Sequence, residues 1–521
     1  MFSGHSLIQK LRGRVRSAWL WPFQWRSGFV NGILLFSVDS QAFKRNDTLM
    51  RGGCCFQLEL SMLMREVFEH LHQSSMREWS ESTMMMDENA GKCDLDGSLV
   101  ESTPESVQYW PYLSFEYFPK RQYHIHHEFK NPSGKQKTVE NNFFKGLKWS
   151  PDGSCFLTSS ENNSLHIFDL PSDAIEDCPE VDMSSCEDSF KSSLMVQEGE
   201  AVYDFCWFPV MAASDTSSCV FATSSRDHPV HVWDATTGKL RCTYRAYDQM
   251  DEITAAYSIS FNPAGSKLFC GYNKTIRIFD TSRPGREFTQ HSTLTSAKDG
   301  QTGIISCLAF NAVNGGLLAA GSYNRTTALY DENSLELLFV LHGQQGGVTQ
   351  VMFSKDGNFL YSGARKDPEI LCWDIRNTAG VLYRLPRVTA DTNQRVAFDI
   401  EPFGRHLGTG GQDGLVHFYD LQTGDWVNSF QAALDTVNSF CFHPSLPLAA
   451  SASGHRRFVV DTEPDSDDQG YTVLLKEEEN CASVWRFPCT WVNSQEQSTT
   501  ATHGDECDYT VTEALNDNTL T

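Results

Sequence analysis

The sequence predicts an all-β protein in which a short antiparallel sheet repeats around a closed ring, and three observations support this prediction. Strand-length apolar runs separated by Gly, Pro, Asn and Asp continue from residue 109 to about 461. Six runs end on an aromatic residue followed by Asp, in the tetrapeptides HIFD, HVWD, RIFD, ALYD, LCWD and HFYD, at intervals of 65, 46, 51, 43 and 46 residues. A turn-forming Asn or Asp stands six residues before each of these aromatics.

The interval between the Asp residues indicates the type of repeat. It matches the roughly 40 to 45 residues of a WD40 blade, a four-stranded unit whose third strand ends on Trp-Asp. We therefore predict a seven-bladed WD40 β-propeller with disordered N- and C-terminal extensions. The residues expected to form the structural WD motif are Asp169, Trp233, Asp234, Asp280, Asp331, Trp373, Asp374 and Asp420.

The first strand of each blade ends in a recognisable turn. In chain order these turns begin at WSPDG (149), FCWFP (205), FNPAG (261), FNAVNG (310), FSKDG (353), IEPFG (400) and FCFHP (440). The third strand of the seventh blade is ambiguous, because both RRFVVD (456–461) and CASVWRFPCTW (481–491) fit. No strand of the first repeat precedes Phe143, so either YLSFEYF or QYHIHHEF is free to complete the last blade and leave no open sheet edge.

Composition changes mark the expected domain boundaries. Residues 1–108 are predicted to be a mostly disordered N-terminal extension with one possible helix at 60–72, residues 109–492 to be the propeller with an acidic insertion at 172–200, and residues 493–521 to be an acidic disordered tail. The first 38 residues are basic and contain no acid, which is compatible with a targeting peptide or with an unstructured leader. Their longest apolar run is too short to span a bilayer, so we expect no membrane partner.

Charge and cysteine content restrict the function classes. The chain carries 42 basic and 66 acidic residues, a formal charge of −24, which argues against broad adhesion to nucleic acid or anionic lipid and confines any nucleic-acid site to a local patch. The 16 cysteines contain no CxxC pair, and several lie in apolar runs, which favours a reducing compartment.

No catalytic or cofactor motif stands out. The sequence contains no phosphate-binding loop, no dinucleotide-type Gly-rich turn, no HExxH and no GxSxG, and the carboxylates recur at fixed positions of the repeats, as a scaffold requires. His124 and His126 share one face of a strand, but a third metal ligand is lacking, and a solvated strand is the better interpretation. We expect a protein that is not an enzyme and that needs no cofactor and no metal.

Positive charge recurs in the turns between the second and third strands, which share one face of a propeller. These turns read SSRDHPV, GYNKTIR, SYNRTTA, GARKDPE and SGHRRF, and Arg395 belongs to a loop on the same face. A single exposed charge or an adjacent pair is worth only about 0 to 1 kcal/mol, but like charges on one face call for a partner that carries phosphate or carboxylate. The candidate residues are Arg226, Lys274, Arg325, Arg365, Lys366, Arg395, Arg456 and Arg457, with Tyr272 and Tyr323 beside them for stacking on unpaired bases.

Several blocks of sequence resemble the telomerase Cajal body protein 1 family of WD40 proteins over roughly residues 110 to 458. The resemblance rests on KGLKWSPDGSCFLTSSENNSLHIFDLP, on the segment from SSRDHPVHVWD through RAYDQMDEITAA to RIFDTSRPGRE, on SGARKDPEILCWDIR and on HPSLPLAASASGHRRF. The blocks RAYDQMDEITAA and SGARKDPE are not demanded by the fold. The basic leader and the extreme C-terminus depart from the family pattern, which leaves targeting open.

The resemblance implies a non-catalytic RNA-binding adaptor. Family members recognise the CAB-box loop of small Cajal-body H/ACA RNAs and of telomerase RNA, and they direct these particles to Cajal bodies and telomerase to telomeres. The implied partners are dyskerin and other H/ACA proteins, the telomerase reverse transcriptase complex, coilin and the cytosolic chaperonin, and the implied locations are the nucleus, Cajal bodies, telomeres and cytoplasm. Carried over by position, the RNA-binding role falls on Arg365 and Lys366, then on Arg226, Lys274 and Arg277. The alternative is a WD40 scaffold that binds only protein, such as a peptide or chromatin reader or a ligase substrate receptor.

Overall fold

The computed structural model of the chain describes residues 109–126, 142–174, 190–294, 300–456 and 479–493, together with two short strands, β1 (Arg26–Val30) and β2 (Ile33–Ser37). The chain divides into two compact units, residues 1–104 and 105–521. In the first unit β1 and β2 pair antiparallel, with Val30 opposite Ile33, although the sequence analysis expected no strands there. The helix expected at 60–72, the rest of the N-terminal extension and the tail beyond residue 493 lie outside the described residues.

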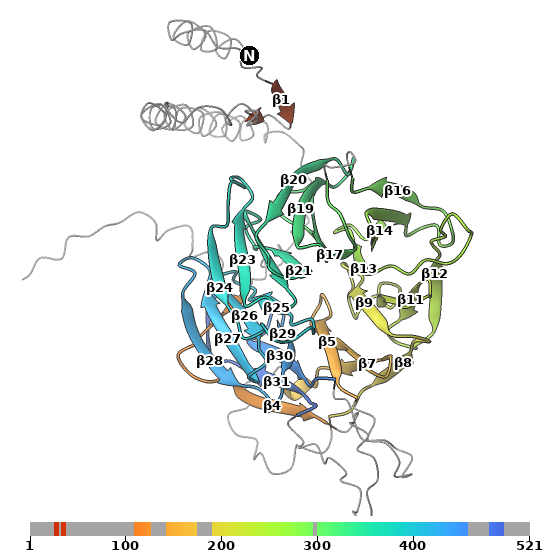
Figure 1. The fold of residues 1–521 in the computed structure, drawn as a ribbon. Helices are drawn as coiled ribbons and strands as arrows, with labels where there is room; N and C mark the ends of the chain where they lie inside the picture. Colours follow the sequence, from red (N-terminus) through yellow and green to blue (C-terminus); the bar gives the residue numbers. More distant parts are fainter. Residues whose placement is uncertain are drawn as a thin grey trace, which may run out of the picture. The chain divides into compact units, whose positions relative to one another are not determined.

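The second unit contains seven four-stranded antiparallel sheets arranged as blades around a ring (Figure 1). This confirms the predicted seven-bladed propeller. Within blades 1 to 6 the four strands follow chain order from the ring centre outward. Blades 1 to 3 contain β5 (Phe144–Trp149), β6 (Cys155–Ser160), β7 (Ser164–Asp169) and β8 (Leu194–Gln197); β9 (Val202–Trp207), β10 (Val220–Ser225), β11 (Val230–Asp234) and β12 (Leu240–Tyr244); and β13 (Ser258–Phe261), β14 (Lys267–Tyr272), β15 (Thr275–Asp280) and β16 (Thr289–Ser292).

The remaining blades have the same plan. Blades 4 to 6 contain β17 (Ile305–Phe310), β18 (Leu317–Ser322), β19 (Thr326–Asp331) and β20 (Leu337–His342); β21 (Val348–Phe353), β22 (Phe359–Ala364), β23 (Glu369–Asp374) and β24 (Tyr383–Pro386); and β25 (Phe398–Ile400), β26 (His406–Gly410), β27 (Leu415–Asp420) and β28 (Trp426–Gln431). Blade 7 combines β29 (Val437–Phe442), β30 (Leu448–Ser453) and β31 (Ala482–Arg486) with β4 (Lys120–Ile125) from the other end of the domain.

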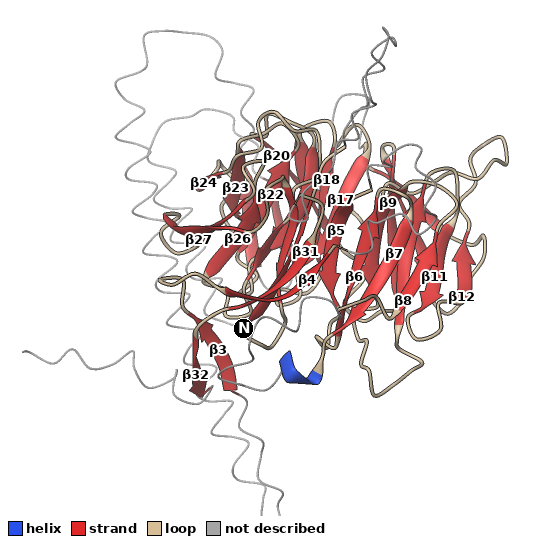
Figure 2. Ribbon diagram, turned by 90° about the horizontal axis from the view of Figure 1, so that it is seen from below, coloured by secondary structure: helices blue, strands red, loops and turns tan. Residues whose placement is uncertain are grey.

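The seventh blade settles both ambiguities in the sequence. Its third strand is β31, from the CASVW segment, and residues 457–461 of the alternative lie outside the described residues. The closing strand comes from the QYHIHHEF segment, since Tyr123 lies opposite Val484. The preceding segment forms β3 (Tyr109–Leu113), which pairs with β32 (Cys489–Asn493) in a separate two-stranded sheet below the ring (Figure 2).

The WD-motif Asp residues end the third strands of blades 1 to 6, and in blades 2 to 6 the Asp carboxylate accepts a backbone N–H of the following turn. In blade 2 the Asp234 Oδ1 accepts the backbone N–H groups of Thr236 and Thr237, both at 2.9 Å, and its Oδ2 pairs with Arg241 at 2.8 Å. In blade 5 the Asp374 carboxylate caps the N–H of Arg376 at 2.9 Å. Asp is therefore required here because its short side chain can satisfy the backbone of the turn.

The motif tryptophans hold the interiors of their blades. The Trp373 indole N–H donates to the Ser362 Oγ at 3.0 Å, and the Gln344 amide donates to the same hydroxyl at 2.9 Å. The Trp233 indole donates to the buried Glu198 carboxylate and to the Thr223 hydroxyl. These bonds satisfy polar groups that would otherwise be costly to bury.

Hydrophobic cores lie between blades rather than within them. Seven clusters of buried apolar side chains are present in the described residues, and each cluster joins two neighbouring blades. Phe221 of blade 2, for example, packs in one cluster with Leu157 of blade 1. Every blade thus buries both of its faces, which explains the nearly continuous burial of the second strands and the stability of a closed ring.

The acidic insertion is shorter than predicted. β8 lies within residues 172–200 and forms the outer strand of blade 1, so only the segment between β7 and β8 interrupts this blade. It begins with a 3-10 helix, η4 (Ser172–Ala174), and residues 175–189 lie outside the described residues. The strand was missed because LMVQ is only four residues long and is flanked by acidic sequence.

Candidate nucleic-acid interface

The predicted basic turns share one face of the ring, which we call the upper face. Successive strands of a blade run antiparallel, so the turns between second and third strands and the loops between blades emerge on the same side. Backbone hydrogen bonds join them: the Arg226 N–H donates to the Ala201 carbonyl at 3.0 Å, and the Lys274 N–H to the Gly303 carbonyl at 2.8 Å. This face is turned toward the viewer in Figure 1 and lies at the top in Figure 2, opposite η4 and the β3–β32 sheet.

Three of the exposed cations occupy left-handed backbone positions at the tips of these turns. Lys274 has φ 57°, Arg325 has φ 64° and Lys366 has φ 49°. At the tips of the turns of blades 1 and 6, which carry no base, the left-handed residues are Asn163 and Gly414, the residue types that adopt this conformation most readily. Blades 3, 4 and 5 therefore place a cation where the backbone alone would favour Gly or Asn.

Five cations of the upper face form no ion pair with a carboxylate. In the part of the chain that the structure describes, no carboxylate oxygen lies within 4 Å of Arg226, Lys274, Arg325, Arg365 or Lys366. The neighbouring Asp367 is buried and accepts the Gln345 backbone N–H at 2.7 Å instead of pairing with Lys366. These positive charges therefore remain available to an anionic partner.

Arg365 and Arg395 converge on one tyrosine near the ring axis. The Tyr323 hydroxyl accepts from the Arg395 Nη2 at 2.8 Å and from the Arg365 Nη2 at 3.1 Å, and the Arg365 guanidinium also lies 4.9 Å from the Tyr323 ring centroid. The Arg395 Nη1 donates to the Tyr203 carbonyl at 3.0 Å. Burial lowers the pKa of Arg365, and the charge of Arg395 lowers it further while Tyr323 opposes both. Arg395 thus links blades 2, 4 and 6 across the central channel.

A second basic group lies on the same face at the junction of blades 7 and 1. Arg456 and Lys145 both pair with Glu161, and the Lys145 Nζ lies 3.6 Å from the carboxylate. Burial lowers the pKa of Lys145, Glu161 raises it, and the positive charges of Arg456 and Arg395 lower it again. One carboxylate thus serves two cations. The neighbouring Arg457 lies outside the described residues.

Two predicted site residues lie in the interior of blade 3. Tyr272 is 4% exposed and Arg277 is 9% exposed, and the guanidinium lies 4.6 Å from the Tyr272 ring centroid and 4.8 Å from that of Phe288. The Arg277 Nε donates to the Gln290 Oε1 at 3.0 Å across β15 and β16. A tyrosine covered by a buried arginine has no free ring face for a base, so the structure does not bring these two residues into the upper-face surface.

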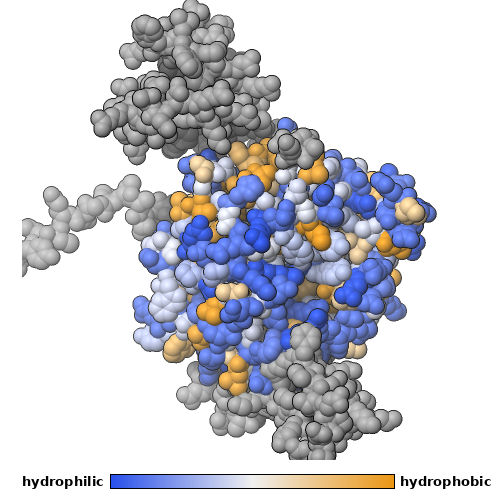
Figure 3. All heavy atoms as spheres, in the orientation of Figure 1, coloured by the Kyte–Doolittle hydropathy of each residue, from blue (hydrophilic) through white to orange (hydrophobic). Residues whose placement is uncertain are grey.

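The sequence analysis missed three residues of this surface: Tyr203, Tyr257 and Lys145. The rings of Tyr203 and Tyr257 stack at 5.3 Å with an interplanar angle of 23°, and the nearby Tyr203 side chain raises the pKa of Arg226. Tyr203 and Lys145 are the second residues of inner strands, and Tyr257 directly precedes an inner strand. Their position at the start of an inner strand could have predicted that they lie on the upper face, near the ring axis. Figure 3 shows that the middle of this face is mainly hydrophilic.

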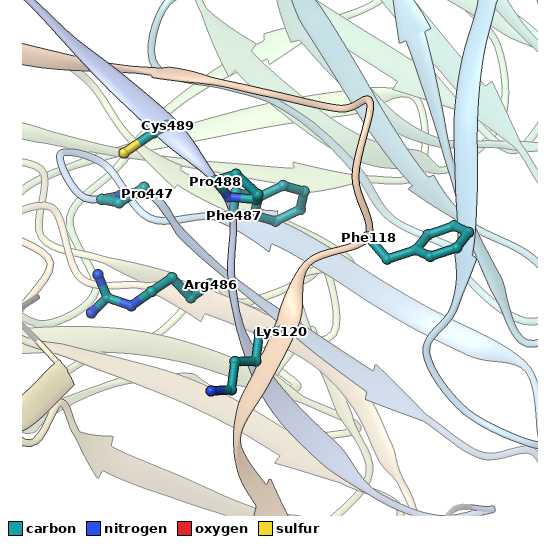
Figure 4. Close-up of a pocket in the computed structure, with 7 residues that line it drawn as sticks. All are labelled: Phe118, Lys120, Pro447, Arg486, Phe487, Pro488 and Cys489. Carbon is teal, nitrogen blue, oxygen red and sulfur yellow. The ribbon is translucent and has the colours of Figure 1, made fainter. Parts of the chain in front are cut away.

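A pocket of about 360 Å³ lies on the opposite face, between blade 7 and the β3–β32 sheet (Figure 4). Its lining residues are Phe118, Lys120, Pro447, Arg486, Phe487, Pro488 and Cys489. The Arg486 guanidinium already donates to the Ala174 carbonyl. Because the pocket is on the other side of the ring, it is separate from the surface formed by the basic turns.

The described ranges contain no group of side chains that could hold a metal ion, and most of their free cysteines are buried. No group of three or more His, Cys, Asp or Glu residues is placed there to hold a metal ion, and the His124 Nδ1 instead lies 3.1 Å from the Ser483 Oγ. Burial raises the pKa of the Cys155, Cys206 and Cys307 thiols to about 12, which makes them poor nucleophiles. None of the helices in the described residues has the length and apolar character needed to cross a membrane.

Known proteins resemble this chain over most of the ring. The family model "WD domain, G-beta repeat" matches residues 136–169, 241–280 and 335–374. Telomerase Cajal body protein 1 of Mesocricetus auratus is 42% identical over 386 residues, which cover 72% of this chain and 69% of that protein. The human protein of the same name is 43% identical over 344 residues, 65% of this chain and 61% of its own length. A guanine nucleotide-binding protein negative regulator 1 from Schizosaccharomyces pombe is 30% identical over 295 residues, 55% of this chain and 72% of that protein.

Proposed function

Because the chain belongs to the telomerase Cajal body protein 1 family, we propose that it is a non-catalytic RNA-binding adaptor. In this proposal the upper face of the propeller recognises the CAB-box loop of small Cajal-body H/ACA RNAs and of telomerase RNA. The matched segment spans less than two thirds of the human relative, so the activity of the whole relative is carried over here only as part of the proposal.

The observation that carries the proposal is the placement of unpaired cations at left-handed turn tips. A non-Gly residue at positive φ costs roughly 1 to 2 kcal/mol relative to glycine, and Lys274, Arg325 and Lys366 all accept this cost. Strain of this kind persists where function requires the side chain. Three cations held on one face of a protein of charge −24 are suited to the phosphates of a nucleic acid.

Arginine and lysine contribute differently to such a surface. The exposed Lys274, Arg325 and Lys366 supply charge for phosphates along the RNA backbone. Arg365 and Arg395 lie nearer the axis and are oriented by Tyr323, and a planar guanidinium so oriented can hold a phosphate with two hydrogen bonds. The outer residues therefore attract the RNA backbone, and the inner pair of arginines holds a phosphate in a defined orientation.

The other faces of the ring remain available for the protein partners of the adaptor. We propose dyskerin and other H/ACA proteins, the telomerase reverse transcriptase complex and coilin as partners, and the cytosolic chaperonin as a folding factor, because these belong to the proposed role. The expected locations are the nucleus and Cajal bodies, with telomeres and the cytoplasm as further sites.

The test replaces all three turn-tip cations by glycine, as Lys274→Gly, Arg325→Gly and Lys366→Gly, in the full chain. Each contact with a single-stranded phosphate is worth roughly 0.7 log units of affinity per tenfold change in salt. At 0.15 M salt the triple variant should bind a CAB-box hairpin about 50-fold more weakly, and the slope of log affinity against log salt should fall by about 2. Fluorescence anisotropy over a salt series measures both quantities.

Glycine makes this test independent of folding. Glycine accepts positive φ without cost, so the variant should melt at the same temperature as the wild type or above it. The matched control is Asn163→Gly, which relieves the same backbone position in blade 1 without removing charge. Unchanged RNA affinity in the triple variant would remove these cations from the site, and a wild-type chain that ignores RNA at 0.15 M salt would favour a scaffold that binds only protein.

A further inference from the structure

Three half-buried tyrosines and three arginines form a connected cluster at the upper mouth of the central channel. Tyr323 is held by Arg365 and Arg395, and Arg395 reaches from the loop before blade 6 to the Tyr203 carbonyl in blade 2. Tyr203 in turn stacks on Tyr257 of blade 3, and it lies near enough to Arg226 to raise the pKa of that guanidinium. Side chains from five blades, 2 to 6, therefore meet at one place, although they are distant in the sequence.

The stacked tyrosine pair has the geometry of a base-binding platform. Ring centroids 5.3 Å apart with planes tilted by 23° make an offset stack, the arrangement in which aromatic rings also receive nucleobases. Both tyrosines keep part of their surface exposed. No hydrogen bond of the Tyr257 hydroxyl occurs among the described contacts, so this hydroxyl does not tie the ring to a neighbouring blade.

Among the described residues the arginines around the platform form no ion pair within 4 Å, although, against the effect of burial, Tyr323 and the more distant charge of Asp204 raise the pKa of Arg395. Two guanidinium groups share the single neutral hydroxyl of Tyr323, and the buried Nε of Arg365 has no hydrogen-bond acceptor. Two like charges beside an unused buried donor are stabilised when an anion enters, because a phosphate offers several acceptor oxygens and negative charge. The cluster thus combines an anion site with an aromatic surface.

We propose that this cluster binds one unpaired nucleotide of the RNA loop, with its base stacked against the Tyr203–Tyr257 pair and its phosphate held by Arg365 and Arg395. This inference rests on the proposed function. It adds a site that binds a base of the RNA, in addition to the sites that bind its phosphates. Stacking accepts any base, so the platform anchors an extruded nucleotide without choosing its identity.

The experiment places 2-aminopurine at each loop position of a CAB-box hairpin in turn and measures its fluorescence on binding the full chain. Stacking on tyrosine should quench the probe at one loop position and leave the other loop positions unchanged. The Tyr257→Leu variant should lose this quenching and bind about tenfold more weakly. Its salt slope should stay that of the wild type, because no phosphate contact is removed.

Tyr257→Phe is the matched control, since it keeps the ring and should bind and quench as the wild type does. The melting temperature shows whether Tyr257→Leu folds. Quenching in the wild type tests the stacking site even if that variant does not fold. If the wild type binds the hairpin and the glycine variants weaken it, but no position is quenched, the stacking site is refuted and the adaptor proposal stands. If the wild type does not bind the hairpin, both proposals fall.

Discussion

Asp399 of blade 6 provides a pH-dependent test of how neighbouring blades are joined. Its carboxylate lies on the inner strand β25, where one oxygen accepts the Phe442 N–H of blade 7 at 2.9 Å and the other accepts the Ile400 N–H at 2.9 Å. No cation lies within 4 Å of it among the described ion pairs. Burial raises the pKa of Asp399 from 3.8 to about 6, with Lys355 and the two hydrogen bonds opposing.

The sign of the effect follows from the raised pKa. Between pH 3.8 and 6 the carboxyl of the unfolded chain has lost its proton and that of the folded chain has kept it, so the free energy of unfolding decreases as the pH rises through this window. The shift corresponds to ~3 kcal/mol as an upper limit, because the side chain is partly exposed. Asp399→Asn keeps the acceptor for Phe442 but loses that for Ile400, so we expect it to stabilise the protein by ~1 to 2 kcal/mol at pH 7 and by almost nothing at pH 4.

Urea denaturation at pH values from 4 to 8 measures this difference, and Asp204→Asn is the matched control. Asp204 likewise accepts two backbone N–H groups, from Ile259 at 3.0 Å and Phe205 at 2.9 Å, but it also pairs with Lys148 at 3.3 Å. Its replacement should therefore destabilise the protein slightly. The reasoning is refuted if Asp399→Asn destabilises at pH 7, or if its difference from the wild type does not change with pH.

Three further variants test other features of the ring. Burial lowers the pKa of His443 to about 4; the wild type should thus lose up to ~3 kcal/mol of unfolding free energy as the pH falls from 6.5 toward 4, and His443→Gln should lose less in the same denaturation series. A Cβ at residue 346 would lie 1.6 Å from the Arg365 carbonyl oxygen, so Gly346→Ala should displace this turn and weaken RNA binding in anisotropy assays, whereas Gly380→Ala, with open space around it, should not. Trp373→Phe removes a buried indole hydrogen bond and should lower the free energy of unfolding by ~1 to 2 kcal/mol, without changing the salt slope of RNA binding.

The ring was predictable because its information is local and repeated. The third strands of blades 1 to 6 each carry an Asp, and the turn before each of them carries an Asn or Asp, so six imperfect copies support one another. The repeat also limited the closing strand to two candidate segments, because a complete seventh blade needs one strand from before the first repeat. The β1–β2 hairpin also had a local signal, because Val30 and Ile33 flank the dipeptide Asn-Gly, but this signal occurs once and is not part of the repeat.

The channel cluster was not predictable, because its contacts join residues far apart in the chain. Arg395 meets the Tyr203 carbonyl across 192 residues and Tyr323 across 72. Strand register explains why Arg277 was wrongly expected on the surface. Arg277 closely follows a basic turn, but its position in β15, opposite Cys270 and Gln290, directs its side chain into the blade. A shift of one residue in a strand reverses the face a side chain occupies, and spacing from a turn does not supply that information.

The negative charge of the chain strengthens the argument for a local RNA site. An RNA approaching a protein of charge −24 is repelled over most of its surface at distances within about 8 Å, the screening length at physiological salt. Under the proposed function, binding is favoured where Lys274, Arg325 and Lys366 bring positive charge together, so the acidic surroundings would suppress non-specific contact while the cations supply attraction. A more basic protein with the same site would bind more RNAs with less discrimination. Added positive charge on the lower face should accordingly raise affinity for unrelated RNA more than for the CAB-box hairpin.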